Sequence, residues 1–337
     1  MDNRPILAIT MGDPGGIGPE IILKALRSET IFGRCRPLVV GDQRILERAA
    51  AFLSYPVLHF ERIAESPRAG EYQPGTIPLL DLRNADPVKC PVGQISAASG
   101  RAAVEFVFRA CDLALANQID AIVTAPLNKA AMHLAGFTGY AGHTELLTDR
   151  TGARKVSMLL VGPKLRVMHV STHVSLEEAI RMVSKERVVE VIRLADEACQ
   201  ALGIHQPRIA VAGLNPHASE NGLFGSQDGE HIQPAVEECR ACGTRVTGPL
   251  PPDTVFLRAV QGEFDIVVAM YHDQGHIPMK LLGFDRGVNV SIGLPIIRTS
   301  VDHGTAFDIA GMGIARPDSL LAAIEVAIQM VEARKTQ

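Results

Sequence analysis

The sequence has little of what nucleic-acid-binding proteins carry. Aromatic residues make up 4% of its 337 residues, Lys and Arg form no block, and the formal net charge is −4. Such a chain offers few rings to stack on bases and no basic surface for phosphates. We therefore expect no nucleic-acid partner.

Long apolar runs are also missing. Every apolar run is interrupted well short of the about 20 residues that a membrane-spanning helix needs. The first run, in MDNRPILAITMGDPGG, is broken at once by Gly-Asp-Pro-Gly-Gly, unlike a signal peptide. We expect a cytoplasmic protein with no membrane partner.

Two common metal and cofactor patterns are incomplete. Among six scattered cysteines, only Cys239 and Cys242 form a C-x-x-C pair, and residues 234–242 are predicted to form a helix. A zinc site would need a second C-x-x-C pair. The turn at residues 11–20 has glycines spaced G-x-x-G-G-x-G, not the dinucleotide-binding G-x-G-x-x-G. A tight turn with positive φ and close backbone approach accounts for these glycines.

Strand-like and helix-like segments alternate along the chain. The pattern predicts an α/β fold with many parallel strands. Predicted strands cover residues 5–10, 37–42, 120–125, 156–161, 165–171, 208–214 and 264–270, and the fourth and fifth read as a hairpin. Predicted helices cover residues 21–26, 47–53, 96–116, 185–202 and 318–335. Residues 60–95 are rich in Pro and Gly, and their organisation is not predicted.

Most of the chemistry lies in residues 269–310. The strand 264–270 runs into YHDQGH (residues 271–276), at the strand end where open α/β sheets bind ligands. Cations and an amide that suit a small anion follow: Lys280, Arg286, Asn289 and Arg298. We expect the flanking apolar runs MKLL and VNVSIGLPII to be buried, which argues against a plain surface loop.

Three histidines each follow a predicted strand: His173, His217 and His272. Parallel strands end at one edge of a sheet, so the three rings can converge there. Three neutral imidazoles with an open position are typical of a catalytic divalent metal, zinc first, with cobalt, nickel or iron open. His169 reads as a core or supporting residue, and His276 and His303 as supporting residues.

A second polar cluster lies in GFTGYAGHTELLTDR (residues 136–150), where His143 and Thr144 also read as a helix start. Further distinctive segments of the chain are MGDPGGIGPE, TAPLNK, GHTE, HVSTH, NPHASENGLFG, GPLPPDTVF, YHDQGHIP and GVNVSIGLPIIRTSVDHGTAFDIAG. Together they resemble one family, the 4-hydroxythreonine-4-phosphate dehydrogenases. TAPLNK and the His-Ile-Pro after YHDQG are closer to the branch that acts on 4-phospho-D-threonate or 4-phospho-D-erythronate.

The resemblance implies a fold of the isocitrate/isopropylmalate dehydrogenase type. That fold has two α/β/α domains with a cleft between them and forms a homodimer with shared active sites. We place the first domain at residues 1–137 with 289–337, and the second at 138–288, carrying the histidines and the dimer interface. The family's nicotinamide site consists of loops, and NAD is the expected cofactor.

The resemblance also implies the site. Metal ligands fall on His173, His217 and His272, contributed across the dimer interface, with one divalent metal per subunit (zinc first; cobalt, magnesium or manganese open). Substrate contacts fall on His143, Thr144, Lys280, Asn289 and Arg298. All these positions carry the residue type that the family has.

We therefore hypothesise NAD- and metal-dependent oxidation, with decarboxylation, of a 4-phosphorylated 3-hydroxy acid, most directly 4-phospho-D-threonate or 4-phospho-D-erythronate. Lys280 and Asp253 are the acid/base candidates and His143 is a third, although Lys280 could equally form an ion pair with the substrate. The main alternative is 4-hydroxy-L-threonine 4-phosphate dehydrogenase of vitamin B6 synthesis. Further alternatives are an aromatic-diol dehydrogenase, a metal-dependent hydrolase or aldolase, and a metabolite-binding protein with a structural metal.

Overall fold

The computed structural model describes residues 2–55, 58–63, 67–283 and 286–336. Contacts divide the chain into two compact units, Met1–Arg154 with Leu294–Val331, and Lys155–Gly293 with Glu332–Gln337. We expected boundaries near residues 137 and 289. The first unit extends further because Leu146 of helix α6 (His143–Thr151) packs with Val104 and Met132 of that unit.

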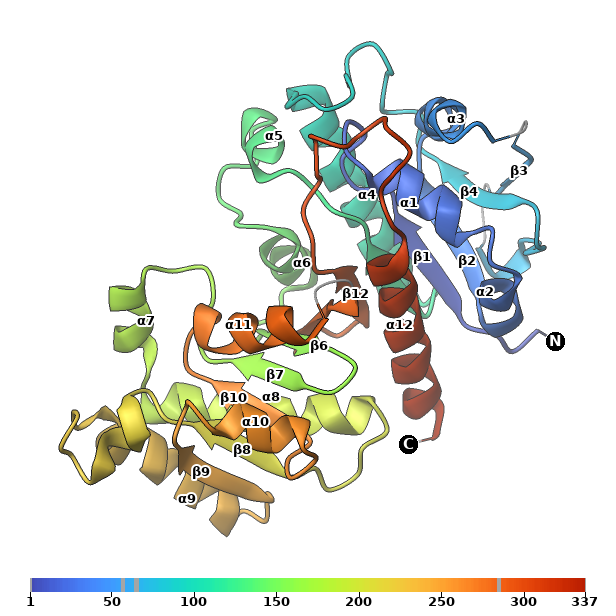
Figure 1. Cartoon of the computed structure of the whole chain (residues 1–337). Coiled ribbons are helices and arrows are strands. Elements are labelled where there is room, and N and C mark those ends of the chain that lie inside the picture. Colours follow the sequence, from blue (N-terminus) through green and yellow to red (C-terminus); the bar gives the residue numbers. More distant parts are fainter. Residues whose placement is uncertain (1, 56–57, 64–66, 284–285, 337) are drawn as a thin grey trace. The chain divides into compact units, whose positions relative to one another are not determined.

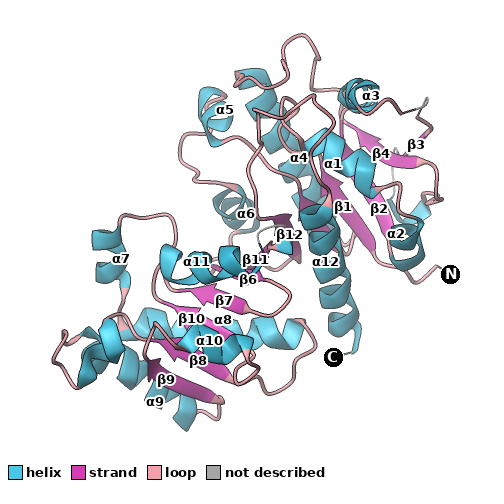
Figure 2. Ribbon diagram, viewed as in Figure 1, coloured by secondary structure: helices cyan, strands magenta, loops and turns pink. Residues whose placement is uncertain are grey.

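The first unit contains a parallel sheet with the strand order β3-β4-β2-β1-β5-β12. The strands are β1 (Ile6–Thr10), β2 (Arg36–Gly41), β3 (Phe60–Arg62), β4 (Ile77–Asp81), β5 (Ala121–Thr124) and β12 (Arg298–Val301). Every residue of β1, β2 and β5 is buried, as expected for parallel strands with both faces covered. Figure 2 shows the helices that flank these strands.

The helices of the first unit are α1 (Gly18–Ala25), α2 (Glu29–Arg34), α3 (Gln43–Phe52), α4 (Ala97–Leu115), α5 (Lys129–Leu134), α6 and α12 (Asp318–Thr336) up to Val331, with a 3₁₀ turn at Pro67–Ala69. Helix α4 packs against β1, β2 and β5. Ser96 caps α4 by accepting a 3.0 Å hydrogen bond from the backbone N–H of Ser99. Gly100 lets α5 pack closely on α4, because an added Cβ would lie 2.0 Å from the carbonyl oxygen of Ala131.

The glycine-rich turn before α1 is a packed junction. Gly12 has φ +72°, and a Cβ on Gly18 would lie 2.2 Å from the carbonyl oxygen of Met11, so both expected reasons for glycine are present. The buried carboxylate of Glu20 accepts backbone N–H hydrogen bonds from Gly311 at 2.6 Å and Gly313 at 3.0 Å. The turn is thereby tied to the C-terminal part of the chain.

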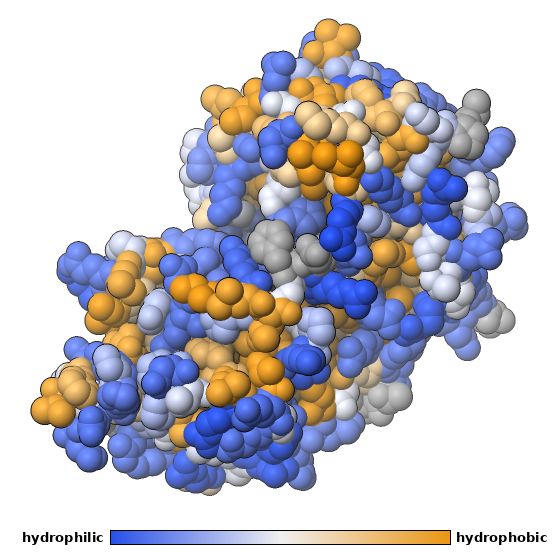
Figure 3. All heavy atoms as spheres, viewed as in Figure 1, coloured by the Kyte–Doolittle hydropathy of each residue, from blue (hydrophilic) through white to orange (hydrophobic). Residues whose placement is uncertain are grey.

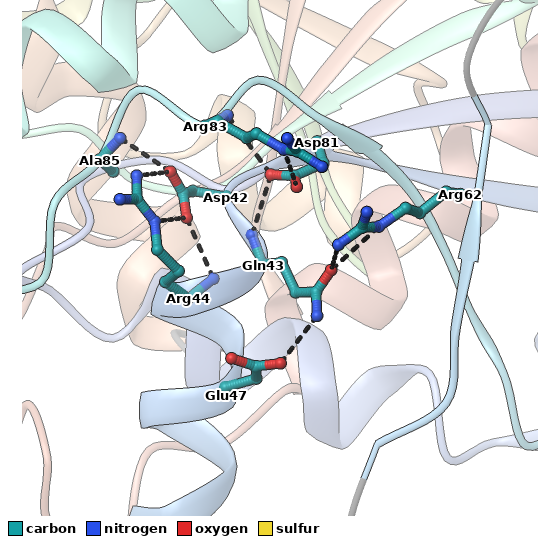
Figure 4. A network of polar contacts seen from close by, with 8 residues as sticks. All are labelled: Asp42, Gln43, Arg44, Glu47, Arg62, Asp81, Arg83 and Ala85. Carbon is teal, nitrogen blue, oxygen red and sulfur yellow. Dashed lines mark hydrogen bonds and ion pairs between the residues drawn. The ribbon is translucent and has the colours of Figure 1, made fainter.

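Carboxylates at the ends of β2 and β4 organise the start of α3 (Figure 4). Asp42, which is fully buried, accepts from the backbone N–H groups of Arg44 and Ala85 and from the Arg44 guanidinium. Asp81 accepts from the backbone N–H of Gln43 at 3.2 Å and from Arg83. The carboxylates at this strand edge therefore stabilise the backbone at the start of α3.

The second unit contains a mixed sheet with the strand order β11-β6-β7-β10-β8-β9. The strands are β6 (Ser157–Val161), β7 (Arg166–His169), β8 (Ile209–Ala212), β9 (Val246–Leu250), β10 (Ile266–Ala269) and β11 (Val288–Ile292). β7, β10, β8 and β9 are parallel, while β6 is antiparallel to β7 and β11. The predicted hairpin is therefore confirmed, and residues 289–293 belong to this unit because β11 pairs with β6.

Helices cover both faces of this sheet. They are α7 (Leu176–Met182), α8 (Lys185–Ala201), α9 (Gln233–Ala241), α10 (Val255–Val260) and α11 (His272–Gly283), with short helical turns at Pro216–Glu220 and Asp228–Ile232. Val167, Ala210 and Val267 form one core cluster with residues of α10 and α11. Helix α8 packs against β6, β7, β8 and β10 and lies behind the sheet in Figure 1.

All predicted strands and helices are present, with ends that differ by a few residues. In the segment without a prediction, the described residues form β3 and β4. Within the described part of the chain, no helix is long and apolar enough to cross a membrane.

We predict a pH-dependent role for Asp265, which precedes β10. Its carboxylate accepts hydrogen bonds of 3.0 and 2.9 Å from the Arg208 guanidinium and 2.8 Å from the Arg208 backbone N–H. These bonds lower the pKa of Asp265. Its stabilising contribution is therefore present above the unfolded-state pKa and is lost as pH falls through the folded-state pKa.

Asp265→Asn is expected to lower the free energy of unfolding by about 1–2 kcal/mol at pH 7. The difference from wild type should shrink below about pH 4. Urea unfolding across this range measures it. Asp112→Asn is the control, because its ion pair with Arg150 is more exposed and should contribute less. A difference that stays constant into the acid range would contradict the prediction.

Candidate functional site

The three expected metal-binding histidines follow three neighbouring strands of the second unit. His173 comes after β7, His272 after β10, and His217 after β8. β10 lies between β7 and β8 and runs parallel to both. The carboxyl ends of these strands therefore share one edge, as the sequence predicted.

Two of these rings lie close together within one chain. The ring centroids of His173 and His272 are 5.9 Å apart, whereas the ring of His217 packs beside Phe224, also at 5.9 Å. Across the described ranges of a single chain, no three His, Cys, Asp or Glu residues are placed to hold a metal ion together. The convergence of all three rings is thus not complete in one copy.

His272 is oriented by a neighbouring carboxylate. Its Nδ1 lies 2.6 Å from Oδ1 of Asp273, and this hydrogen bond lowers the pKa of Asp273. Nε2 is then the nitrogen of His272 that remains for a ligand. A carboxylate on the second ring nitrogen is a common way to orient a metal-binding imidazole.

Two buried histidines lie behind His272. The His276 ring stacks on the His272 ring, with centroids 3.6 Å apart and an interplanar angle of 11°. The centroid of the His169 ring lies 4.9 Å from that of His276. Burial lowers the pKa of His276 to about 4 and that of His169 to about 3, so both rings are neutral at pH 7. They line up behind His272, which agrees with the supporting positions expected for them. His303 belongs to the first unit, and its Nδ1 hydrogen-bonds to the carbonyl of Gly304.

The segment after His272 differs from our expectation. Residues 272–283 form a helix, α11, that includes Pro278. The prediction that MKLL is buried is wrong, because Leu281 is 82% exposed and Leu282 46%. In this helix Gln274, Gly275, His276 and Met279 face the protein, and the two leucines fall outside that face.

His217 lies on a backbone turn that an aspartate holds in place. His217 and the four residues after it all have positive φ, an unfavourable region for residues other than glycine. The buried carboxylate of Asp228 accepts from Ser219 Oγ at 2.6 Å and from the backbone N–H groups of Leu214 and Asn215. These bonds stabilise the strained turn.

The other expected residues of the second unit lie on separate elements. Asp253 is exposed in the loop before α10, and Lys280 is exposed on α11, two turns after His272. Asn289 is half-buried on β11, where its Nδ2 lies 2.8 Å from the sulfur of Met158. Its Oδ1 is buried with no hydrogen-bond partner among the described residues.

The first unit brings Arg298 and His143 together. Arg298 is 2% exposed, and its Nη2 donates to Thr124 Oγ1 at 2.7 Å. Burial lowers the pKa of Arg298 to about 9, while Glu145 acts in the opposite direction. Thr144 follows His143 in the first turn of α6.

His143 is a neutral imidazole. Burial lowers its pKa well below the ordinary value, and Arg298 and Lys129 lower it further. One ring nitrogen hydrogen-bonds to the backbone of Ala125, whose N–H already donates to Thr10. The bond therefore goes to the carbonyl, which leaves Nε2, buried and without a partner among the described residues, as an acceptor.

Sequence reasoning missed Thr124 and Asp228. Thr124 ends a predicted strand at the ligand-binding edge, a signal that could have drawn attention to it. No local pattern marks Asp228, because its partners lie 9 to 14 residues away in an irregular turn.

The donors at the second-unit edge fit a divalent metal that prefers imidazole. His173 and His272 are adjacent, and Asp273 orients His272. Within one chain, His173 and His272, two of the three expected ligands, lie close together, and the ring of His217 packs beside Phe224.

Solved structures share the fold of this chain. The predicted fold, two α/β units of the isocitrate/isopropylmalate dehydrogenase type, is confirmed by similar solved structures. A β-decarboxylating dehydrogenase from Thermococcus kodakarensis shares the fold with a TM-score of 0.51 at 16% identity, covering 96% of this chain and 82% of that one.

The chain belongs to the family described as "Pyridoxal phosphate biosynthetic protein PdxA", whose model matches residues 33–327. It is 51% identical to D-threonate 4-phosphate dehydrogenase of Cupriavidus necator, over 99% of both chains. It is 49% identical to 4-hydroxythreonine-4-phosphate dehydrogenase of Desulfosudis oleivorans, over 97% of this chain and 96% of that protein. The crystal structure of 4-hydroxythreonine-4-phosphate dehydrogenase from Klebsiella pneumoniae matches with a TM-score of 0.88 at 47% identity, covering 97% and 100% of the two chains.

We predict that Gly275 is required for the histidine packing. A Cβ at Gly275 would lie 2.3 Å from Nε2 of His169 and 2.7 Å from Cγ1 of Val167, so Gly275→Ala must displace α11 or His169. The expected loss is about 1–3 kcal/mol of unfolding free energy, measured by urea unfolding. Gly283→Ala, on the same helix and with only an ordinary contact at 4.0 Å, is the matched control and should cost little. Equal stability of both variants would contradict the packing described.

Proposed function

We propose that this protein is an NAD-dependent dehydrogenase of a 4-phosphorylated 3-hydroxy acid, which it oxidises at C3 with subsequent decarboxylation. D-threonate 4-phosphate and D-erythronate 4-phosphate are the substrates we favour. The observation that carries the proposal is the 51% identity, over 99% of both chains, to an enzyme named for the first of these substrates. NAD is the expected hydride acceptor, and no residue is assigned to it.

The first unit supplies groups that suit the substrate. Arg298 is a buried cation that suits an anionic end of the substrate, and Thr144 lies in the first turn of α6, where the helix N-terminus favours an anion. Because His143 is neutral and its Nε2 is an acceptor, it can accept a hydrogen bond from a substrate hydroxyl. The lowered pKa makes His143 a weak proton acceptor, so it remains the third acid/base candidate after Lys280 and Asp253.

The second unit supplies the remaining groups. Lys280 and Asp253 are exposed and remain candidates for proton transfer, and Asn289 presents an amide oxygen without a partner among the described residues. We propose that His173 and His272 of one subunit and His217 of the other hold one divalent metal, with zinc first. When bound, such an ion polarises the reacting oxygen and stabilises the negative charge that develops during oxidation and decarboxylation.

We further propose that the protein is a homodimer formed by the second unit. Exposed apolar side chains gather on its helices and loops: Val174, Leu176, Ile180, Leu223, Phe224, Leu257, Ile277, Leu281 and Leu282. Figure 3 shows hydrophobic residues along the face over α11. An exposed apolar stripe such as the one over α11 is typical of a protein–protein interface.

A second candidate is 4-hydroxythreonine 4-phosphate dehydrogenase, because relatives of 47–49% identity carry that name. The two substrates differ at C2, and none of the side chains described here selects between a hydroxyl and an amino group. No observation favours the hydrolase, the aldolase or the structural-metal alternative, and the relatives are named dehydrogenases.

We predict chelator-sensitive NADH formation by the metal-loaded protein. D-threonate 4-phosphate, D-erythronate 4-phosphate and 4-hydroxythreonine 4-phosphate should be compared by NADH absorbance, with and without chelator. One of the first two should be preferred. A preference for the third substrate would favour the second candidate, and NADH from none of them would refute the proposed activity.

The histidine assignment needs a matched pair of variants. His217→Ala should reduce bound metal, measured by elemental analysis, and lower activity by at least about 10- to 100-fold. His205→Ala, an exposed histidine with no assigned role, should behave like wild type. Unchanged metal content in His217→Ala would contradict the ligand set.

We predict that Leu281→Glu, at an 82%-exposed position of α11, weakens the dimer because it introduces a charge into an apolar interface. Sedimentation velocity should show a shift from dimer to monomer. Leu134→Glu, at a 64%-exposed position of the first unit, is the control and should remain dimeric. A monomeric wild-type protein would contradict the proposed assembly.

A further inference from the structure

Lys129 lies beside the substrate-binding residues proposed for the first unit. It is the first residue of α5, whose N-cap Asn128 accepts a 2.9 Å hydrogen bond from the backbone N–H of Ala131. Five residues earlier, Thr124 ends β5 and holds the Arg298 guanidinium. One strand end thus positions both Arg298 and Lys129.

The side chain of Lys129 reaches the start of α6. A Cβ built on Gly142, the N-cap residue of α6, would lie 3.9 Å from Cε of Lys129 and 3.7 Å from Oε2 of Glu145. The next residue is His143, whose pKa the charges of Arg298 and Lys129 both lower. Arg298, Lys129 and His143 therefore surround the same small region.

Lys129 adds a cation to this region, where Glu145 acts on Arg298. In the described part of the chain, no carboxylate lies within ion-pair distance of Lys129. Helix α6 has no side-chain cap, so its N-terminal N–H groups add positive potential. A lysine with no carboxylate partner among the described residues, beside a helix N-terminus, favours binding of an anion.

We propose that Lys129 is a further specificity-determining residue, which binds the phosphate end of the substrate together with Arg298. The inference rests on the proposed function and extends it to a residue outside our expected substrate contacts. A phosphate monoester carries about −1.5 to −2 charge at pH 7, and a carboxylate carries one unit. The region offers Arg298, Lys129 and a helix N-terminus, so the more highly charged end of the substrate is the better match. A lysine ammonium binds phosphate as a point charge and needs no fixed geometry.

Direct anion binding tests the proposal without any turnover. Thermal unfolding of the full-length protein should be followed with increasing inorganic phosphate, in the absence of nicotinamide, for wild type and three variants. Lys129→Met removes the charge at similar length, Lys129→Arg keeps it, and Lys89→Met removes an exposed lysine elsewhere in the first unit. Phosphate should raise the midpoint of wild type, Lys129→Arg and Lys89→Met, and Lys129→Met should lose most of that rise. An equal rise in Lys129→Met, or no rise in wild type, would overturn the proposal.

Kinetics supply the second readout. With D-threonate 4-phosphate, Lys129→Met should raise KM by about 10- to 100-fold and leave kcat within a few-fold, because a charged hydrogen bond to the non-reacting end is lost. Lys129→Arg should recover most of the loss. Unphosphorylated D-threonate, tested as a competitive inhibitor, should inhibit wild type and Lys129→Met equally. Weaker inhibition in Lys129→Met would assign the lysine to the carboxylate and overturn the phosphate assignment.

The proposed dehydrogenase activity and the proposed role of Lys129 can be refuted independently. If no substrate yields NADH, the proposed activity fails, while the phosphate titration still decides the role of Lys129. If NADH forms and Lys129→Met has wild-type KM and phosphate response, the dehydrogenase stands and the inference about Lys129 is wrong.

Discussion

The parallel pairing of β10 with β7 on one side and β8 on the other is the constraint on which the site in the second unit depends. Parallel strands place their carboxyl ends at one edge, so residues separated by dozens of positions in sequence meet there. His173, His217 and His272 each follow one of these strands, and each takes its place from the sheet. The surrounding groups then set details, such as the contact of Asp273 with His272 and the stacking of His276 behind it.

The sequence predicted the features that depend on local patterns. β-branched apolar runs marked the strands, and apolar residues at helical spacing marked α4. The placement of three histidines at one edge also followed, because parallel strand order constrains where strand ends lie.

What was not predicted depends on contacts between distant segments. MKLL is apolar, and only the packing of α11 determines that Met279 is buried while Leu281 is exposed. The support that Asp228 gives to the His217 turn, and that Thr124 gives to Arg298, requires knowing which backbone groups lie nearby in three dimensions. The incomplete convergence of the histidines has the same origin: the backbone after β8 turns through residues of positive φ and carries His217 toward Phe224.

The first unit is built from two separate segments, residues 1–154 and 294–331, and most of the second unit, residues 155–293, lies between them in the sequence. Its strand β5 pairs with β12, which is synthesised nearly 180 residues later. Glu20 accepts hydrogen bonds from the backbone of Gly311 and Gly313, which are synthesised nearly 300 residues later. On the ribosome, the sheet of the first unit has an open edge at β5 until residues 298–301 emerge. The inserted unit has all six of its strands by residue 292 and can complete its sheet earlier. Synthesis therefore makes all the strands of the second unit available before the last strand of the first.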